Sequence, residues 1–367
     1  MALLEGGQRI RNTYEVERLL GEGAFAEVYR VKHRFLGRQA MKVFKTPGIS
    51  LDETVRALSE AVLLSRLGHP NIIRVFDADL LELPTGTHGF CTMEYVAGGS
   101  LQQFWQSFGP KFIPVETVIE IVRQICRGLA VAHGSSPPII HRDIKPQNVL
   151  VGYEAEGLRV RISDFGLAKH ANPLTLLVSA RGTRCFKSPE AFRDFNSDST
   201  AGDVWAVAVT LYLLLTDRFP LSVPEDMGDM DPKCFDLPII PPSRLNVAVD
   251  DSLDRIVFRG LAVDPKRRYP AAQDLLRDLE QWSPEKTSAS PVKHPASAET
   301  SKSVLGSPSP ADEQIARERV KNAFELARGG GRLVQAADLL EEAFNKWPPL
   351  RSEYESQVKL WRRGIVM

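Results

Sequence analysis

Several features that restrict what a protein can do are scarce or missing in this sequence. Only four cysteines, Cys91, Cys126, Cys185 and Cys234, occur in 367 residues, and none forms a CxxC pair. Their spacing argues against a metal knuckle or a disulfide framework and fits a reducing compartment, so we expect a cytoplasmic protein. Lys plus Arg equals Asp plus Glu at 46 each. With no net charge, the chain lacks the basic field that would favour nucleic acid or an anionic membrane as a partner.

Long apolar runs and a secretion signal are also missing. The longest apolar run, residues 204–215, is too short to span a bilayer and predicts a buried helix. The first twelve residues lack a basic start, a long apolar core and a small-residue cleavage site, so we expect no secretory leader. The length predicts two or three domains, and the 43% hydrophobic and 25% charged fractions are typical of a globular chain.

Three regions differ in composition. Residues 14–282 alternate strand-like and helix-like patterns, with strands early and helices later. Ser50 followed by Glu53 is a capping-box pattern that predicts the start of the first helix. Residues 283–310 are dominated by Ser, Pro, Ala, Thr and Lys and predict a flexible linker, whereas helical periodicity returns in residues 311–367.

A dense polar motif lies where the strand-rich part meets the helix-rich part. In the stretch HRDIKPQN, Asp143, Lys145 and Asn148 surround Pro146, which disfavours a regular helix and predicts a shaped loop. The following residues, 149–162, predict a β-hairpin that returns the chain so that Asp164 of DFG lies near Asn148. Amide and carboxylate oxygens suit Mg²⁺, and Asp143 is then available to accept a proton from a hydroxyl group.

Four residues of the strand-rich part complete this pattern. Gly21 and Gly23 lie in a turn where backbone N–H groups could approach a phosphate, although a hairpin turn without a ligand has the same sequence. Lys42 alternates with apolar residues on a strand and would need an anion if it faces inward. Glu60 on the capped helix could supply that partner; a solvated Lys and a solvated Glu are the alternatives.

These motifs, in this order, resemble the eukaryotic-type (Hanks) Ser/Thr protein kinases and their bacterial members over residues 14–282. The resemblance implies an α+β, two-lobed protein kinase fold, with a β-rich N-lobe, a helical C-lobe and ATP in the cleft between them. It implies that Asp143 is the catalytic base, that Lys145 neutralises the transferring phosphoryl group, and that Asn148 and Asp164 hold Mg²⁺. Lys42 would contact the α- and β-phosphates.

The resemblance also assigns an adenine site. Met93 would be the gatekeeper, and Glu94 and Val96 of the interlobe hinge would offer backbone hydrogen bonds to adenine. The apolar walls would be Leu20, Val28, Ala40 and Leu150. One departure from the family pattern is Ala26, which replaces the third glycine of the Gly-rich loop; the added methyl group alters loop flexibility without removing a chemical group, so we expect catalysis to survive.

The segment from Asp164 to Glu190 resembles the peptide-docking shelf of protein kinases and distinguishes them from small-molecule kinases. Lys145 and Thr183 match the Ser/Thr branch. The resemblance implies that Glu190 pairs with Arg268, with a solvated pair as the alternative, and that Asp203 braces the backbone of the catalytic loop.

Arg142 precedes the catalytic Asp, which in the family accompanies regulation by phosphorylation of the activation loop. A phosphate orders such a loop by pairing with arginine. We therefore expect autophosphorylation at Thr175, Ser179 or both, which mass spectrometry would detect; ordinary loop hydroxyls are the alternative.

The C-terminal region resembles a single tetratricopeptide repeat. Gly331, Ala336, Ala343 and Pro348 match its small residues and its terminal proline in spacing, whereas Phe324 stands where the repeat has a small residue. A helical hairpin of no family is the alternative. Because one repeat is too little to stand alone, we expect this small α-helical segment to dock on the kinase domain or on a partner protein.

The sequence thus predicts an active cytoplasmic Ser/Thr protein kinase that uses ATP and Mg²⁺ and acts on protein substrates. Two alternatives stay open. A pseudokinase scaffold would work through its helical tail, and a small-molecule phosphotransferase would use the same carboxylates on metabolites.

Overall fold

The computed structural model describes residues 2–48, 50–109, 111–154, 157–165, 185–194, 197–221, 232–284 and 310–328, and residues 336, 339–340, 342–343, 347, 350, 354 and 361. For residues 51, 55–57, 60, 232–233, 310–312 and 328 it describes the backbone alone. The chain divides into two compact units, Met1–Glu285 and Lys286–Met367. Each unit is described by itself.

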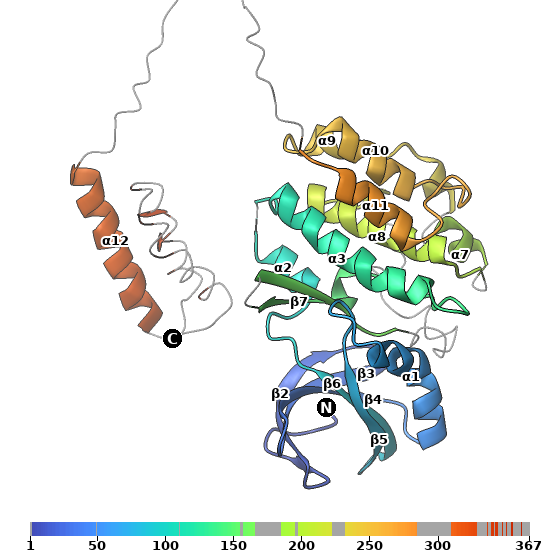
Figure 1. Ribbon diagram of the computed structural model, residues 1–367. Coiled ribbons are helices and arrows are strands. Elements are labelled where there is room, and N and C mark those ends of the chain that lie inside the picture. Colours follow the sequence, from blue (N-terminus) through green and yellow to red (C-terminus); the bar gives the residue numbers. More distant parts are fainter. Residues whose placement is uncertain are drawn as a thin grey trace, which may run out of the picture. The chain divides into compact units, whose positions relative to one another are not determined.

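The first unit begins with a twisted antiparallel sheet, drawn in blue in Figure 1. Its strand order is β1-β2-β3-β4-β6-β5. The strands are β1 (Arg9–Ile10), β2 (Tyr14–Glu22), β3 (Ala26–His33), β4 (Gly37–Phe44), β5 (Val75–Leu83) and β6 (Gly86–Glu94). Neighbouring strands are consecutive in the chain except β4 and β6, which pair in antiparallel register although α1 and β5 lie between them in the sequence.

The two faces of this sheet carry separate hydrophobic clusters, because successive side chains of a strand point to opposite faces. One face, here called the cleft face, is formed by Ala40, Leu58, Ile73, Cys91 and Met93, with partly buried neighbours around them. The other face, here called the outer face, is formed by Leu4, Ile10, Tyr14, Val16, Tyr29, Val31, Met41, Val43 and Phe90.

Helix α1 (Leu51–Arg66) packs on the cleft face through Leu58 and begins as the sequence predicts. The Ser50 side chain accepts a hydrogen bond from the Glu53 backbone N–H at 3.2 Å, and the Glu53 carboxylate accepts one from the Ser50 N–H at 2.8 Å. The predicted capping box is therefore confirmed.

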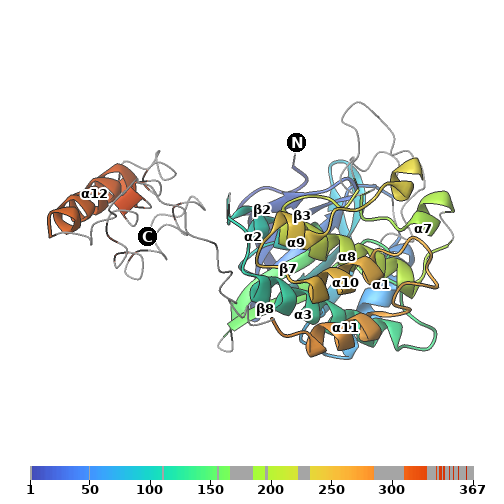
Figure 2. The same cartoon turned by 90° about the horizontal axis from the view of Figure 1, so that it is seen from above.

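The second half of the first unit is helical. Figures 1 and 2 show α3 (Val115–His133), α8 (Thr200–Thr216) and α11 (Ala272–Gln281) side by side. Shorter elements surround them: α2 (Leu101–Gln106), α7 (Pro189–Arg193), η2 (Pro232–Asp236), α9 (Pro242–Leu245) and α10 (Asp251–Gly260). Nearly every residue of α8 is buried, which confirms the buried helix predicted from the apolar run. Within the described parts of the chain, no helix combines the length and apolarity that a membrane crossing requires.

A two-stranded sheet joins the halves of this unit. The strands β7 (Val149–Glu154) and β8 (Gly157–Ile162) pair in antiparallel register, which confirms the predicted hairpin. The hairpin reaches the strand-rich half because the Ile73 N–H donates to the Ile162 carbonyl oxygen at 2.9 Å, and the Ile162 N–H donates to the Asn71 carbonyl oxygen at 2.9 Å. The residues that precede β7 and follow β8 therefore lie together at the junction.

In the second unit, α12 (Pro310–Arg328) contributes Ala316, Val320, Ala323 and Ala327 to a hydrophobic cluster. Phe324 packs edge-on against Tyr354 and Trp361, with ring centroids 5.8 Å and 4.8 Å apart. Ala336 and Ala343, at two expected small-residue positions, are fully buried in this cluster. The assignment as a tetratricopeptide repeat stays a prediction.

Candidate active site

The loop before β7 brings three predicted polar residues together. The Lys145 ammonium lies 2.8 Å from Asp143 Oδ2, and the Asn148 side-chain amide donates to the same oxygen at 2.9 Å and to the Asp143 carbonyl oxygen at 2.8 Å. The predicted loop contains one short 3-10 turn, η1 (Pro146–Asn148), which begins at the proline because its fixed φ suits the first position of a helical turn. The Asp143 carboxylate is therefore oriented by two neighbours of the same loop.

Asp164 follows β8 and carries the second predicted carboxylate. Its Oδ1 atom lies 2.7 Å from Lys42 Nζ, so a residue of the helical half pairs with a residue of β4. The backbone of Asp164 has φ 66°, in the left-handed region that residues other than glycine rarely adopt. Burial alone would raise the pKa of Asp164, but the Lys42 ammonium outweighs it and holds the pKa below its usual range. Asp164 is therefore ionised at neutral pH.

Direct hydrogen bonds join the two carboxylate-bearing segments. The Ser163 N–H and hydroxyl both donate to the Asn148 carbonyl oxygen at 2.9 Å. His141 links the segments a second time: its Nε2 lies 2.8 Å from the Ser163 carbonyl oxygen, while its Nδ1 accepts from the Asp143 N–H at 3.2 Å. Because Nδ1 is the acceptor, Nε2 carries the proton and donates. The loop is thereby held against the residue preceding Asp164.

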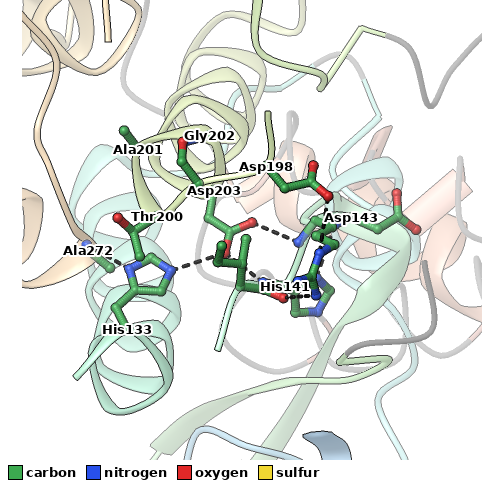
Figure 3. Close-up of polar contacts among 12 residues, drawn as sticks. His133, His141, Asp143, Asp198, Thr200, Ala201, Gly202, Asp203 and Ala272 are labelled. Carbon is green, nitrogen blue, oxygen red and sulfur yellow. Dashed lines mark hydrogen bonds and ion pairs between the residues drawn. The ribbon is translucent and has the colours of Figure 1, made fainter. Parts of the chain in front are cut away.

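A buried carboxylate on α8 holds the start of the loop from the other side (Figure 3). Asp203 Oδ2 accepts from the His141 N–H at 2.7 Å and from His133 Nε2 at 3.0 Å, while Oδ1 accepts from the Arg142 N–H at 2.8 Å. The Ala272 N–H donates to His133 Nδ1 at 3.2 Å, which leaves the proton on Nε2. Asp203 thus occupies the position that the family resemblance implies.

Arg142 is surrounded by polar partners. Its Nε lies 3.1 Å from Asp198 Oδ2, and one of its terminal nitrogens donates to the Ile140 carbonyl oxygen at 2.8 Å. The Arg142 carbonyl oxygen accepts from the Lys187 ammonium at 2.8 Å. Burial raises the pKa of Asp198 despite the nearby cations Lys187 and Arg142. The Asp198 carboxylate therefore lies beside the Arg142 guanidinium, which we expected to pair with a phosphorylated residue of the activation loop.

The ion pair expected between Glu190 and Arg268 is present. Two guanidinium nitrogens lie 2.7 Å and 3.0 Å from the two carboxylate oxygens, and the Arg268 side chain is fully buried. A third bond runs from Arg268 to the Ala201 carbonyl oxygen at 2.8 Å, and the guanidinium stacks over the Trp205 ring. Burial raises and Arg268 lowers the pKa of Glu190, and the net shift is downward. The pair joins α7 to the loop that precedes α11.

The predicted adenine walls share one cluster. Leu20, Val28 and Leu150 are among the partly buried members of the cleft-face cluster that contains Ala40 and Met93, and so is the hinge residue Val96. The segment after β6 lies directly on β7, because the Val151 N–H donates to the Gly99 carbonyl oxygen at 2.9 Å. A Cβ atom on Gly98 would lie 2.2 Å from the Val151 carbonyl oxygen, so only glycine fits there.

The glycine turn forms the tip of the β2–β3 hairpin. Gly21 pairs with Val28 in the strand register, and the Gly23 N–H donates to the Ala26 carbonyl oxygen at 2.8 Å. Ala26 is 5% exposed, so its extra methyl group is accommodated. Neither Gly21 nor Gly23 would bring a Cβ atom within 3.4 Å of another group, so this structure alone does not require glycine at these positions.

Four predicted residues cannot be placed. The side chain of Glu60 lies outside the described atoms, and Thr175, Ser179 and Thr183 fall in residues 166–184, outside the described residues. Their roles, including the pairing of Glu60 with Lys42, stay predictions.

The described residues suit a magnesium nucleotide. Among the described residues, no group of three His, Cys, Asp or Glu side chains could hold a metal by itself. Asn148 and Asp164 would therefore supply only part of an oxygen shell, which is how Mg²⁺ is usually held when phosphates provide the remaining ligands. Lys42 already places one cation at Asp164, and its side chain is only 11% exposed.

Sequence reasoning missed three residues that orient this site: His133, His141 and Asp198. His141 could have been suspected because it belongs to the HRD motif. His133 has no local sequence signal because its partner Asp203 is distant in the sequence. Asp198 was missed because its partner Arg142 was expected to bind a phosphate.

Comparison with protein families matches residues 14–279 to the family described as "Protein kinase domain". A probable serine/threonine-protein kinase of Clostridium perfringens is 31% identical over 282 residues, covering 75% of this chain and 39% of the relative. Serine/threonine-protein kinase PknB of Mycolicibacterium smegmatis is 31% identical over 285 residues, with 74% and 43% covered. Serine/threonine-protein kinase PrkC of Bacillus subtilis is 30% identical over 277 residues, with 74% and 41% covered. The chain thus matches less than half the length of these relatives.

Solved structures include a similar chain, the PknI kinase domain of Mycobacterium tuberculosis. It has a TM-score of 0.55 and 27% sequence identity, and the match covers 76% of this chain and 98% of that one.

Proposed function

The chain belongs to the protein kinase family, and on that premise we propose that it transfers the γ-phosphoryl group of ATP to serine and threonine hydroxyls of proteins. One observation carries the proposal. The Asp143 carboxylate, oriented by Lys145 and Asn148, lies on a loop bonded directly to the segment of Asp164, which pairs with Lys42 of the other lobe. Proton acceptor, metal ligands and phosphate-binding cations are therefore gathered at one junction.

Each side chain has a chemical task in this proposal. Asp143 accepts the proton of the substrate hydroxyl; both hydrogen bonds from its own loop reach Oδ2, so we assign this task to Oδ1. Lys145 lies beside that carboxylate and stabilises negative charge on the transferred group. Bound ATP and Mg²⁺ would supply the phosphoryl group and its charge neutralisation, held by Asn148, Asp164 and Lys42. His141 and Asp203 orient the loop.

The test is transfer of radiolabel from ATP to a generic basic protein. Asp143→Asn should lower kcat by at least about 100-fold, because a general base contributes that much or more. Asp251→Asn, an exposed position in the first turn of α10, is the matched control and should retain wild-type activity.

Other results would point to the alternatives. Equal labelling by wild type and Asp143→Asn would indicate a contaminating kinase and remove the support for this chain's activity. Nucleotide binding without transfer would indicate a scaffold, and transfer to metabolites but not to proteins would indicate a small-molecule phosphotransferase.

We further propose that the protein works in the cytoplasm and that its C-terminal unit binds a partner protein. The four cysteines are free thiols. Burial raises the pKa of Cys91 to about 12, so this thiol is protonated at neutral pH and inert. Free thiols of this kind are typical of a reducing compartment, and cell fractionation would check the location. Affinity capture with and without residues 286–367 would check the partner.

A further inference from the structure

Residues 3–10 lie against the strands that form the Gly-rich hairpin. The Gly7 N–H donates to the Val16 carbonyl oxygen at 2.8 Å, and the Val16 N–H donates to the Gln8 carbonyl oxygen at 2.9 Å, so this segment extends the sheet beside β2. Gly7 has φ 83°, a left-handed conformation that lets the chain turn sharply before β1. Residues 3–10, here called the N-terminal strap, contact β3 on one side of this turn and β2 on the other.

The strap contacts β3 through two hydrogen bonds, and a third bond within β3 connects them. The Leu3 N–H donates to Glu27 Oε2 at 2.8 Å, and the Leu4 N–H donates to the Tyr29 hydroxyl oxygen at 3.0 Å. The Tyr29 hydroxyl in turn donates to Glu27 Oε2. The Leu4 side chain is 3% exposed and packs with Tyr29 in the outer-face cluster.

Glu27 is an unusual residue to bury. It is only 2% exposed, and a carboxylate out of water is costly unless hydrogen bonds replace its hydration. Two of these bonds come from the strap residue Leu3 and from Tyr29. Burial, together with the hydrogen bond to Glu27, raises the pKa of Tyr29 to about 12, so its hydroxyl keeps the proton that it donates. Removing the strap or the hydroxyl would leave the carboxylate short of a donor.

The position of Glu27 connects this network to the nucleotide side of the sheet. Glu27 directly follows Ala26, at the third position of the glycine motif, and precedes Val28 of the cleft-face cluster. Neighbouring side chains of a strand point to opposite faces of the sheet. The strap therefore contacts the outer face of the same short segment of β3 whose Val28 side chain lies on the cleft face.

We propose that the N-terminal strap, through Glu27 and Tyr29, positions the Gly-rich hairpin for nucleotide binding, an inference that rests on the proposed function. Glu27 and Tyr29 are positioning residues, since they act on the face of the sheet away from the cleft. Loosening the strap lets the hairpin leave its binding-competent position, and the apparent affinity for nucleotide falls in proportion to the competent fraction.

The decisive variant is Tyr29→Phe in the full-length chain, because it removes only the hydroxyl and keeps the ring in the cluster. Amide hydrogen exchange of residues 21–28 should become faster by about tenfold, and the Kd for ATP with Mg²⁺ should rise about threefold to tenfold, as expected for one lost charge-assisted hydrogen bond. Tyr14→Phe is the matched control. Tyr14 lies in the same cluster, and its hydroxyl also donates to a carboxylate, Asp77 Oδ2 at 3.3 Å, but it makes no contact with Glu27.

A conservative pair separates positioning from simple destabilisation. Glu27→Gln keeps an oxygen that can accept both hydrogen bonds and should stay within about twofold of wild type in Kd, whereas Glu27→Ala should match Tyr29→Phe. Equal exchange rates and equal Kd values for Tyr29→Phe and Tyr14→Phe would overturn the proposal. If wild type bound no ATP, the proposed function would fail, while the exchange comparison, made without nucleotide, would still decide the role of the strap.

Discussion

Asp203 shows at the scale of one residue how a buried charge can be stable. Its two oxygens accept hydrogen bonds from His141, Arg142 and His133. Burial alone would raise the pKa of Asp203, but the hydrogen bond from His133 and the other donors outweigh it and hold the pKa below its usual range. The carboxylate therefore stabilises the fold only while it is ionised.

We predict that Asp203→Asn lowers the free energy of unfolding by about 3 kcal/mol at neutral pH, because an amide offers one acceptor oxygen and turns two N–H groups toward buried donors. Since the folded-state pKa is lowered, the contribution of Asp203 is fully present above the unfolded value of about 3.9 and is lost as the pH falls through the folded pKa. Urea denaturation at several pH values measures both effects.

The measurements at acid pH test whether the effect of Asp203 depends on its ionisation. Below about pH 4 the stability of Asp203→Asn should fall less steeply than that of wild type, because one proton-linked group has been removed. Asp251→Asn, at an exposed site, should leave the stability at neutral pH unchanged. Parallel acid branches for wild type and Asp203→Asn would show that the Asp203 pKa is not lowered in the folded state.

At the scale of elements, the close approach of the segment after β6 to β7 sets the geometry of the cleft. Gly98 lies where a Cβ atom would meet the Val151 carbonyl oxygen at 2.2 Å, and Gly99 has φ 84°. Both features bring the backbone of this segment within hydrogen-bond distance of β7. The apolar cluster of the cleft spans the same junction, since Val96 and Leu150 are both members.

Gly98→Ala should therefore destabilise the protein by about 1–3 kcal/mol, the usual cost of inserting a methyl group into a packed site. Urea denaturation would measure it. Gly21→Ala adds the same methyl group where no heavy atom lies within 4 Å, and its stability should equal or exceed that of wild type. Equal losses in both variants would contradict the predicted clash.

At the scale of the whole molecule, the first unit has a core of its own. Its principal hydrophobic cluster ends at Trp282, whose carbonyl oxygen accepts from Arg123 and whose indole N–H donates to Asp250. Among the residues that the structure describes, the cluster of the second unit begins at Ala316 and has no member in common with the first.

We predict that a chain ending at Pro284 folds, because no core residue of the first unit is lost. Its melting temperature should lie within about 3 °C of the value for the first unit in the full-length protein. A chain ending at Glu280 removes Trp282 and should melt at least about 5 °C lower, since a buried tryptophan contributes several kcal/mol. Differential scanning calorimetry would compare them. Failure of the longer truncation to fold would show that the second unit contributes to the stability of the first.

The sequence by itself determined the local elements of structure, which depend on residues close to one another in the chain. The capping box at Ser50, the hairpin of residues 149–162 and the buried helix at residues 204–215 follow from local preferences and periodicity, and the structure confirms each. The sequence also predicted that the HRD and DFG segments meet, because a short hairpin can only return the chain to its start.

The family resemblance predicted the Glu190–Arg268 pair and the contact of Asp203 with the loop, but the tertiary structure alone decided the other distant partners of the polar groups. His133 and Asp203 are 70 positions apart, and the Leu3 N–H reaches Glu27 across 24. With 46 acidic and 46 basic residues, a sequence offers many equivalent partners for any one charge. The choice depends on which helix and strand faces approach closely enough to exclude water, and that follows from packing the whole unit.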